Sequence, residues 1–161
     1  MKALTLHAPW AWAVCHLGKD VENRTWKPPA ELIGQRIAIH AGSALQWDAM
    51  YRKFCWAPVF VCANRAPIVK GGQAKVFDTF RTGEHNQRAE RDRFCSAIVA
   101  TAVIERVRPR QGTNDGWYIA GHFGWVLADV RVLPEPVKCK GALGLWTVPA
   151  EIERAIMENG R

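Results

Sequence analysis

Apolar and polar residues alternate along several short segments of the chain, and a period of two is typical of β-strands with one buried face. Alternation predicts a strand over 36–40, and strands are also expected over 4–7, 96–107, 123–133 and 142–148. The range 96–107 is the strongest because it is rich in alanine, isoleucine and valine. A turn containing Pro134 and Pro136 is expected to join the last two strands.

Apolar residues spaced by three and four predict a helix over 9–17 and a second helix that begins at Ser43. Ser43 and Gln46 form a capping box, so unpaired amides at that helix start would face the end of the preceding strand. An anion could dock there. Pro149 is expected to open a short terminal helix.

Between the second helix and the strand at 96–107 the pattern weakens, and we interpret residues 55–93 as a variable insertion. A solvated surface excursion is favoured over a dedicated binding arm for this stretch. Five or six strands with non-local neighbours and few helices predict an α+β fold, a small mixed β-barrel with flanking helices.

The chain has 161 residues, 48% of them hydrophobic, which predicts a single domain over 1–161. No apolar run approaches the roughly 18 residues that cross a bilayer, and the start lacks the apolar stretch of a signal peptide. We therefore expect a cytoplasmic protein with no membrane partner. Five cysteines without a Cys-x-x-Cys pair argue against a disulfide framework or a zinc ribbon, so neither a metal nor another cofactor is expected.

Tryptophan is the outlier of the composition, with eight residues in a chain that has only two tyrosines. An indole ring offers a face on which a base can stack, so this excess of tryptophan beside a net charge of +7 keeps nucleic acid in view, although the charge alone decides little. For any single tryptophan, however, a place in the core of a small barrel is the more common role.

The segment 20–26 carries the most distinctive chemistry. If it is extended, it places Glu22, Arg24 and Trp26 on one face, just after Lys19. Two cations and one carboxylate suit phosphate and the exocyclic amine of a base. A structural ion pair between Glu22 and Arg24 across the barrel mouth is an equally good reading of that pair, and Lys19 is the stronger functional candidate.

The stretches 4–11 and 18–26 resemble the opening of ASCH domains, in particular the transcriptional coactivator branch and its bacterial and phage relatives. The family's hallmark is Gly-x-Lys-x-x-Glu-x-Arg, which Lys19, Glu22 and Arg24 match, while Gly18 stands one place later than the pattern asks. Pro9-Trp10 upstream and Trp26 downstream strengthen the likeness, which extends over most of the chain except roughly residues 55–93.

The resemblance implies a PUA-like β-barrel with a cleft lined by the motif, in a superfamily whose other branches bind RNA or read modified bases. We therefore expect a nucleic-acid-binding domain, with RNA, another nucleic acid or a modified nucleoside as partner. The candidate ligand-binding residues are Trp10, Lys19, Glu22, Arg24, Trp26, His40, Gly42 and Ser43.

The alternative is enzymatic, because small members of the same superfamily remove an acyl group from modified cytidine and others are assigned ribonuclease activity. In that case Lys19 and Glu22 would be catalytic, with Glu22 as a general base for water. The threonine nucleophile of those amidohydrolases is replaced by Glu22, and a ribonuclease would have to use His7, His16 or His40. Binding is therefore the first hypothesis and hydrolysis the second.

Two expectations about geometry and charge follow. Lys19, Glu22 and Arg24 should approach one another at the mouth of the barrel, with Gly42 and Ser43 on the opposite wall. The run of Arg106, Arg108 and Arg110 at the end of the strongest strand should meet phosphates, which would make binding depend on salt.

Overall fold

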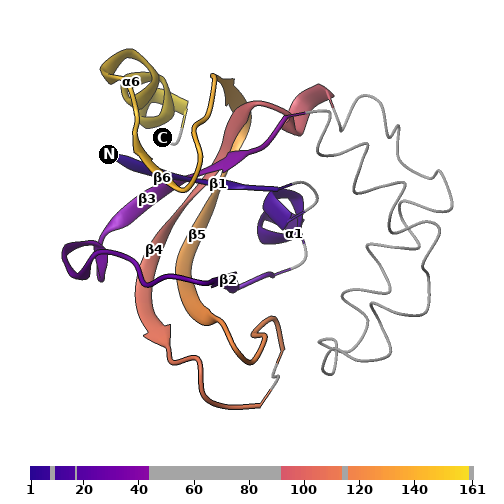
Figure 1. Cartoon of the computed structure of the whole chain (residues 1–161). Coiled ribbons are helices and arrows are strands. Elements are labelled where there is room, and N and C mark those ends of the chain that lie inside the picture. Colours follow the sequence, from indigo (N-terminus) through magenta and orange to yellow (C-terminus); the bar gives the residue numbers. More distant parts are fainter. Residues whose placement is uncertain (8–9, 17, 44–91, 114–115, 160–161) are drawn as a thin grey trace, which may run out of the picture.

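The computed structural model describes residues 1–7, 10–16, 18–43, 92–113 and 116–159 of the chain (Figure 1). The described elements, in chain order, are β1 (Lys2–Leu6), α1 (Trp10–His16), β2 (Val21–Arg24), the 3-10 helix η1 (Ala30–Leu32), β3 (Arg36–Ala41), β4 (Ala97–Arg108), β5 (Phe123–Lys138), β6 (Leu145–Thr147) and α6 (Ala150–Asn159).

The six described strands form one mixed sheet in the order β2-β5-β4-β3-β1-β6. β1 and β3 pair in parallel, and the other neighbouring pairs are antiparallel. The long strands β4 and β5 form the middle of the sheet, which curls into a half-barrel (Figure 1). The predicted α+β class with a curved, barrel-like sheet is confirmed at this level.

One prediction about the strands is wrong: the chain does not turn at Pro134 and Pro136. β5 continues through both prolines to Lys138, and the last strand is shortened to Leu145–Thr147. The pairing of β5 with β4 explains why the prolines are tolerated, because its register shifts between the pairs Ala100↔Val132 and Ile98↔Val137. The prolines lie within this irregular interval, where a missing amide costs no regular ladder bond.

The helix predicted over 9–17 is confirmed as α1 over Trp10–His16, and the terminal helix is confirmed as α6 directly after Pro149. Gly18 follows α1 with a φ of 64°, a left-handed conformation that glycine adopts without strain and that favours the end of a helix. The predicted helix after Ser43, and all of the predicted insertion except residues 92–93, lie outside the described residues.

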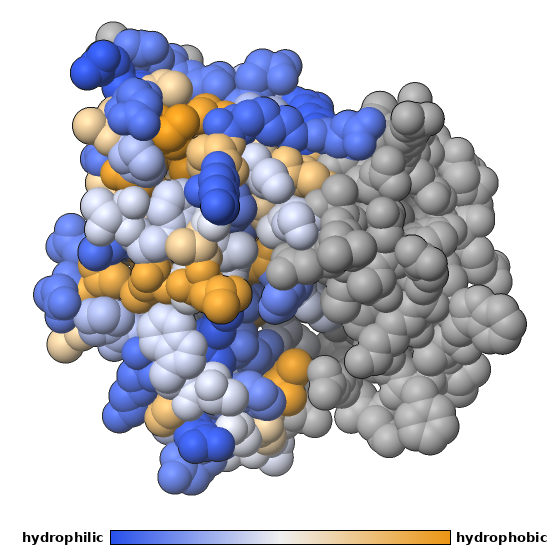
Figure 2. All heavy atoms as spheres, turned by 45° about the horizontal axis from the view of Figure 1, so that its top comes forward, coloured by the Kyte–Doolittle hydropathy of each residue, from blue (hydrophilic) through white to orange (hydrophobic). Residues whose placement is uncertain are grey.

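The two faces of the sheet carry separate cores because side chains alternate along each strand. The concave face, which α1 covers, buries residues such as Leu4, Ile39 and Trp125. The other face buries Ala38 and Leu133 among others, together with Ile156 of α6. In the space-filling view, hydrophobic side chains also reach the surface between hydrophilic ones (Figure 2).

Candidate functional site: a buried Lys-Glu-Arg cluster

Lys19 lies in the short link between α1 and β2, and its side chain turns inward. Its backbone amide donates to the Ala13 carbonyl of α1 (3.2 Å), which fixes the link against the helix. The residue is only 4% exposed. Its ammonium group donates to the Val21 carbonyl (2.5 Å) and to Glu22 Oε2 (2.6 Å). A buried lysine needs such partners, because an unpaired buried charge is very unfavourable.

Glu22 is also buried, on β2 opposite Trp125 of β5. Its second carboxylate oxygen, Oε1, lies 3.2 Å from Nε of Arg24, at an angle that makes an ion pair but no hydrogen bond. Both oxygens of Glu22 therefore face a cation. The expected approach of Lys19, Glu22 and Arg24 is confirmed.

Arg24 also reaches across the curled sheet. Its Nη2 donates to the backbone carbonyl of Thr5 on β1 (2.7 Å). β2 and β1 are the first and fifth strands in the sheet order, so a contact between them requires the sheet to bend back on itself. Arg24 thus bridges the open side of the half-barrel, which gives it a structural role alongside any role in binding.

The cluster holds two cations against one carboxylate and so carries one net positive charge. Some of its donors are unused. The Lys19 ammonium has three N–H bonds and directs two of them to protein acceptors. The Nε of Arg24 is buried and faces Glu22 Oε1, so it is not open to a further acceptor. The cluster therefore retains one Lys19 N–H for a further acceptor, such as a phosphate oxygen or a base carbonyl.

The two tryptophans of the motif are partly buried and pack against the core. The Trp26 ring meets the buried Trp125 ring edge to face, with centroids 4.7 Å apart, and the Trp26 carbonyl accepts from Trp125 Nε1 (3.1 Å). Trp10 packs between the main core and a smaller cluster around Trp117. Their proposed role in stacking a base remains a prediction.

His40 is not part of the Lys19 cluster. It lies on β3 between Ile39 and Ala41, which face the concave core, so alternation directs its side chain to the other face. There it contacts the Thr5 hydroxyl (3.2 Å) and the Cys139 carbonyl (3.2 Å), and it is almost fully buried. Burial lowers the pKa of His40, and the bond to the Cys139 carbonyl opposes this shift.

Gly42 and Ser43 follow β3 directly. The Gly42 amide donates to the Leu6 carbonyl (2.9 Å), and its carbonyl accepts from the Ser96 amide (3.0 Å), so both its backbone groups are used. Ser43 is exposed. The helix expected after Ser43 lies outside the described residues, and its anion site stays a prediction.

A group of basic and aromatic residues adjoins the cluster, and sequence reasoning found only part of it. The Lys27 ammonium and the Arg110 guanidinium both lie over the ring of Phe123, at 5.4 and 5.7 Å from its centroid. Arg108 lies over the ring of Tyr118 at 4.1 Å. Because Phe123 pairs with Arg24 in the sheet, Lys27, Arg110 and Phe123 form a basic-aromatic band beside the Lys19 cluster. Arg108 and the buried Tyr118 pack instead at Gly124, on the other face of β5.

Arg106, the first residue of the arginine run, is 62% exposed and pairs with Glu105 beside it.

Among the described residues, no group of three or more His, Cys, Asp or Glu side chains is placed to hold a metal. The described cysteines, Cys15, Cys95 and Cys139, are unbridged, and burial raises the pKa of Cys15 to about 12.

Comparison with models of known protein families gives no match for this chain, and comparison with curated proteins gives none either. The resemblance to ASCH domains therefore rests on the motif residues themselves. Within the described ranges, no helix has both the length and the apolar character that crossing a membrane requires.

Proposed function

We propose that the chain is a PUA-like domain of the ASCH type that binds nucleic acid, either RNA or a modified nucleotide, through the Lys-x-x-Glu-x-Arg cluster. The observation that carries this proposal is the buried cluster of Lys19, Glu22 and Arg24, with its net positive charge and the unused N–H of Lys19. Buried charges without a ligand are expensive, so clusters of this kind concentrate at functional sites.

In this proposal each residue has a separate task. Glu22 holds the two cations in place through its two oxygens. Lys19 offers its remaining N–H to a phosphate or to the carbonyl edge of a base, and Arg24 adds its positive charge beside it. The fixed ion pairs position these donors before the ligand arrives, which reduces the entropy lost on binding.

The basic-aromatic band supports a polymer or a nucleotide rather than an uncharged ligand. Lys27 and Arg110 carry positive charge beside the ring of Phe123, which pairs with Arg24 in the sheet. Cations that follow a phosphate backbone beside aromatic rings are typical of single-stranded nucleic-acid sites.

Binding is favoured over hydrolysis by the surroundings of Glu22. A general base must accept a proton from water, but both Glu22 oxygens already face a cation. Thr25, the only threonine within the motif segment, lies just beyond the end of β2 and is exposed. Neither a free base nor an adjacent nucleophile is present in the described part of the motif.

Fluorescence anisotropy with a labelled single-stranded RNA, measured over a series of salt concentrations, tests the binding site. The double variant Lys27→Gln/Arg110→Gln should reduce the salt slope by about two units, one for each phosphate that is no longer neutralised. The charge-matched control Lys140→Gln/Arg154→Gln, at other exposed positions of the chain, should leave the slope nearly unchanged. Equal reductions in both double variants, or affinity that does not change with salt, would contradict the proposed surface.

A second measurement separates binding from hydrolysis. The wild-type protein and Glu22→Gln are incubated with a panel of acylated cytidine nucleosides, and the products are followed by mass spectrometry. We expect no turnover by either protein. Wild-type turnover that falls by roughly 100 to 10,000 fold in Glu22→Gln, the usual contribution of a positioned base, would reverse the order of the two hypotheses.

A further inference from the structure

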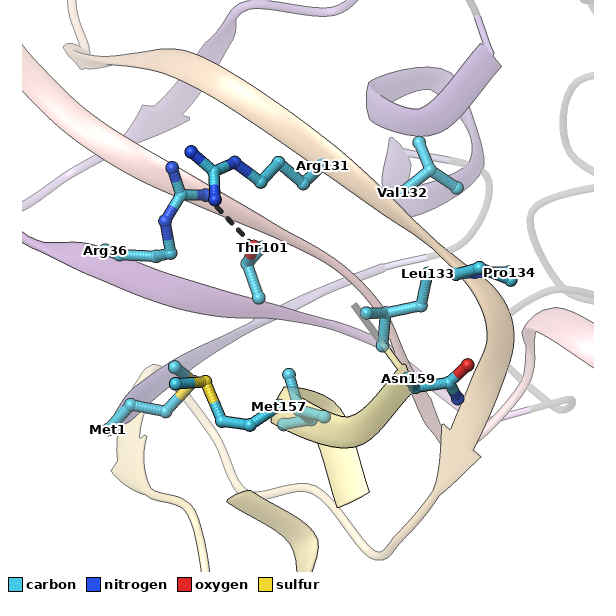
Figure 3. Close-up of a pocket in the computed structure, with 10 residues that line it drawn as sticks. Met1, Arg36, Thr101, Arg131, Val132, Leu133, Pro134, Met157 and Asn159 are labelled. Atoms are coloured by element: carbon cyan, nitrogen blue, oxygen red, sulfur yellow. Dashed lines mark hydrogen bonds between the residues drawn. The ribbon is translucent and has the colours of Figure 1, made fainter. Parts of the chain in front are cut away.

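A cavity lies between the sheet and α6, on the face opposite the Lys19 cluster, and the core residues Leu133 and Ile156 form part of its lining. Its volume is about 380 Å³, within the range of about 300–1,000 Å³ that small-molecule sites occupy. Figure 3 shows that its lining divides into two ends. Arg36, Arg131 and Thr101 lie together at one end, and Met1 and Met157 lie side by side at the other.

The polar end is built around Asp129, which sits at a bulge of β5 with a φ of 44°. The guanidinium groups of Arg36, from β3, and of Arg131, from β5, both bind its carboxylate. Hydrogen bonding and charge from Arg131 and Arg36 lower the pKa of Asp129, although partial desolvation opposes this, so the group is ionised at neutral pH. Two guanidinium groups against one carboxylate leave one net positive charge.

The two arginines differ in how firmly they are held. Arg36 also donates through Nη1 to Thr101 Oγ1 (3.0 Å) and to the Asp129 carbonyl (3.0 Å), so it is fixed on several sides. Arg131 binds Asp129 through Nε and Nη2 only, and its side chain is 66% exposed. Its remaining Nη1 group is therefore the donor that an incoming anion can reach.

The apolar end has a buried floor and an open rim. Leu133 and Ile156 form the floor and are almost fully buried. Met157 of α6 forms the rim and is 60% exposed. A short hydrocarbon body in the cavity would cover it.

From these two ends we propose that the cavity binds a small amphipathic carboxylate, with its head group on Arg131 and its apolar body against Leu133, Ile156 and Met157. A single negative charge matches the net charge of the polar end. A phosphate dianion would exceed it and would face repulsion from Asp129. This proposal is independent of the nucleic-acid site, because it uses none of the residues of the Lys19 cluster.

Calorimetric titration of the full chain with butanoate, hexanoate, octanoate and decanoate tests the proposal. Each added methylene should raise the affinity about fourfold until the cavity is filled. Octan-1-ol, which has the same body as octanoate but no charge, should bind at least ten times more weakly. The proposal is overturned if octanol and octanoate bind equally, or if none of the carboxylates binds at millimolar concentration.

Two variants and one spectroscopic measurement locate the site. Arg131→Gln should weaken octanoate binding at least tenfold, whereas the control Arg106→Gln, which removes the same charge at a similarly exposed position, should not change it. Met157→Ala should weaken octanoate binding several fold and butanoate binding less. In a protein labelled on its methionine methyl groups, octanoate should shift the NMR signals of Met1 and Met157. Equal weakening in Arg131→Gln and Arg106→Gln, or unshifted signals at saturation, would exclude this cavity.

Discussion

The buried ion pair of Lys19 and Glu22 yields the sharpest prediction about stability. Lys19 is 4% exposed and the Glu22 side chain 10%, so neither group can regain full hydration when its partner is removed. Breaking a buried pair by neutralising one partner costs about 3–5 kcal/mol, and we expect a loss in this range for Glu22→Gln because it leaves two cations without a counter-charge. Lys19→Met should cost less, about 1–3 kcal/mol, because Glu22 keeps Arg24.

A double-mutant cycle measures the coupling directly. The variant Lys19→Met/Glu22→Gln no longer contains an unpaired lysine, so its destabilisation should fall short of the sum for the two single variants by about 1–3 kcal/mol. The free energies of unfolding come from urea titrations of the four proteins, with Arg106→Gln as an exposed control that should change little. If the losses in unfolding free energy of the two single variants simply add in the double variant, Lys19 and Glu22 are not energetically coupled, and the prediction is refuted.

Two further predictions concern His40 and Gly124. Burial lowers the pKa of His40 in the folded state, so the unfolded chain binds a proton at a higher pH than the folded chain does. The free energy of unfolding should therefore fall as the pH drops below about 6.5. Thermal unfolding between pH 7.5 and 5 should show a smaller decrease in melting temperature for His40→Gln than for the wild type. A Cβ at Gly124 would lie 2.7 Å from the Tyr118 ring and 3.0 Å from Val21, so Gly124→Ala should lower the midpoint of urea unfolding by overpacking the start of β5.

Patterning alone predicts much of the fold, because its signals are local. The run of alanine, isoleucine and valine in 96–107 identifies β4 almost to the residue, and the apolar stripe that ends at Gly18 identifies α1. The strand through Pro134 and Pro136 shows where local rules fail. A proline cannot donate the backbone hydrogen bond of a regular strand position, so the two prolines predict a turn. Nothing in the sequence indicates that the pairing of β4 with β5 becomes irregular there, which is what lets the strand continue.

The candidate site likewise has features that the local sequence predicts and features that it does not. The spacing of Lys19, Glu22 and Arg24 is a local feature, and their contact follows from it once the segment is extended. The burial of Lys19 and the bond from Arg24 to the Thr5 carbonyl depend instead on how far the sheet curls, which no local pattern encodes. Likewise the ring of Phe123 contacts both Lys27 and Arg110, which come from two other parts of the chain.

Arg24 makes two kinds of contact, and together they bear on how the proposed site would respond to a ligand. Arg24 closes the half-barrel through Thr5 and completes the ion pairs of Glu22, so the shape of the barrel and the charge of the cluster are held by one side chain. If the cluster binds an anion as proposed, the added negative charge favours Arg24 in this position and so stabilises its contact with β1. Anion binding and closure of the half-barrel would then be linked, and each would favour the other by the same free energy.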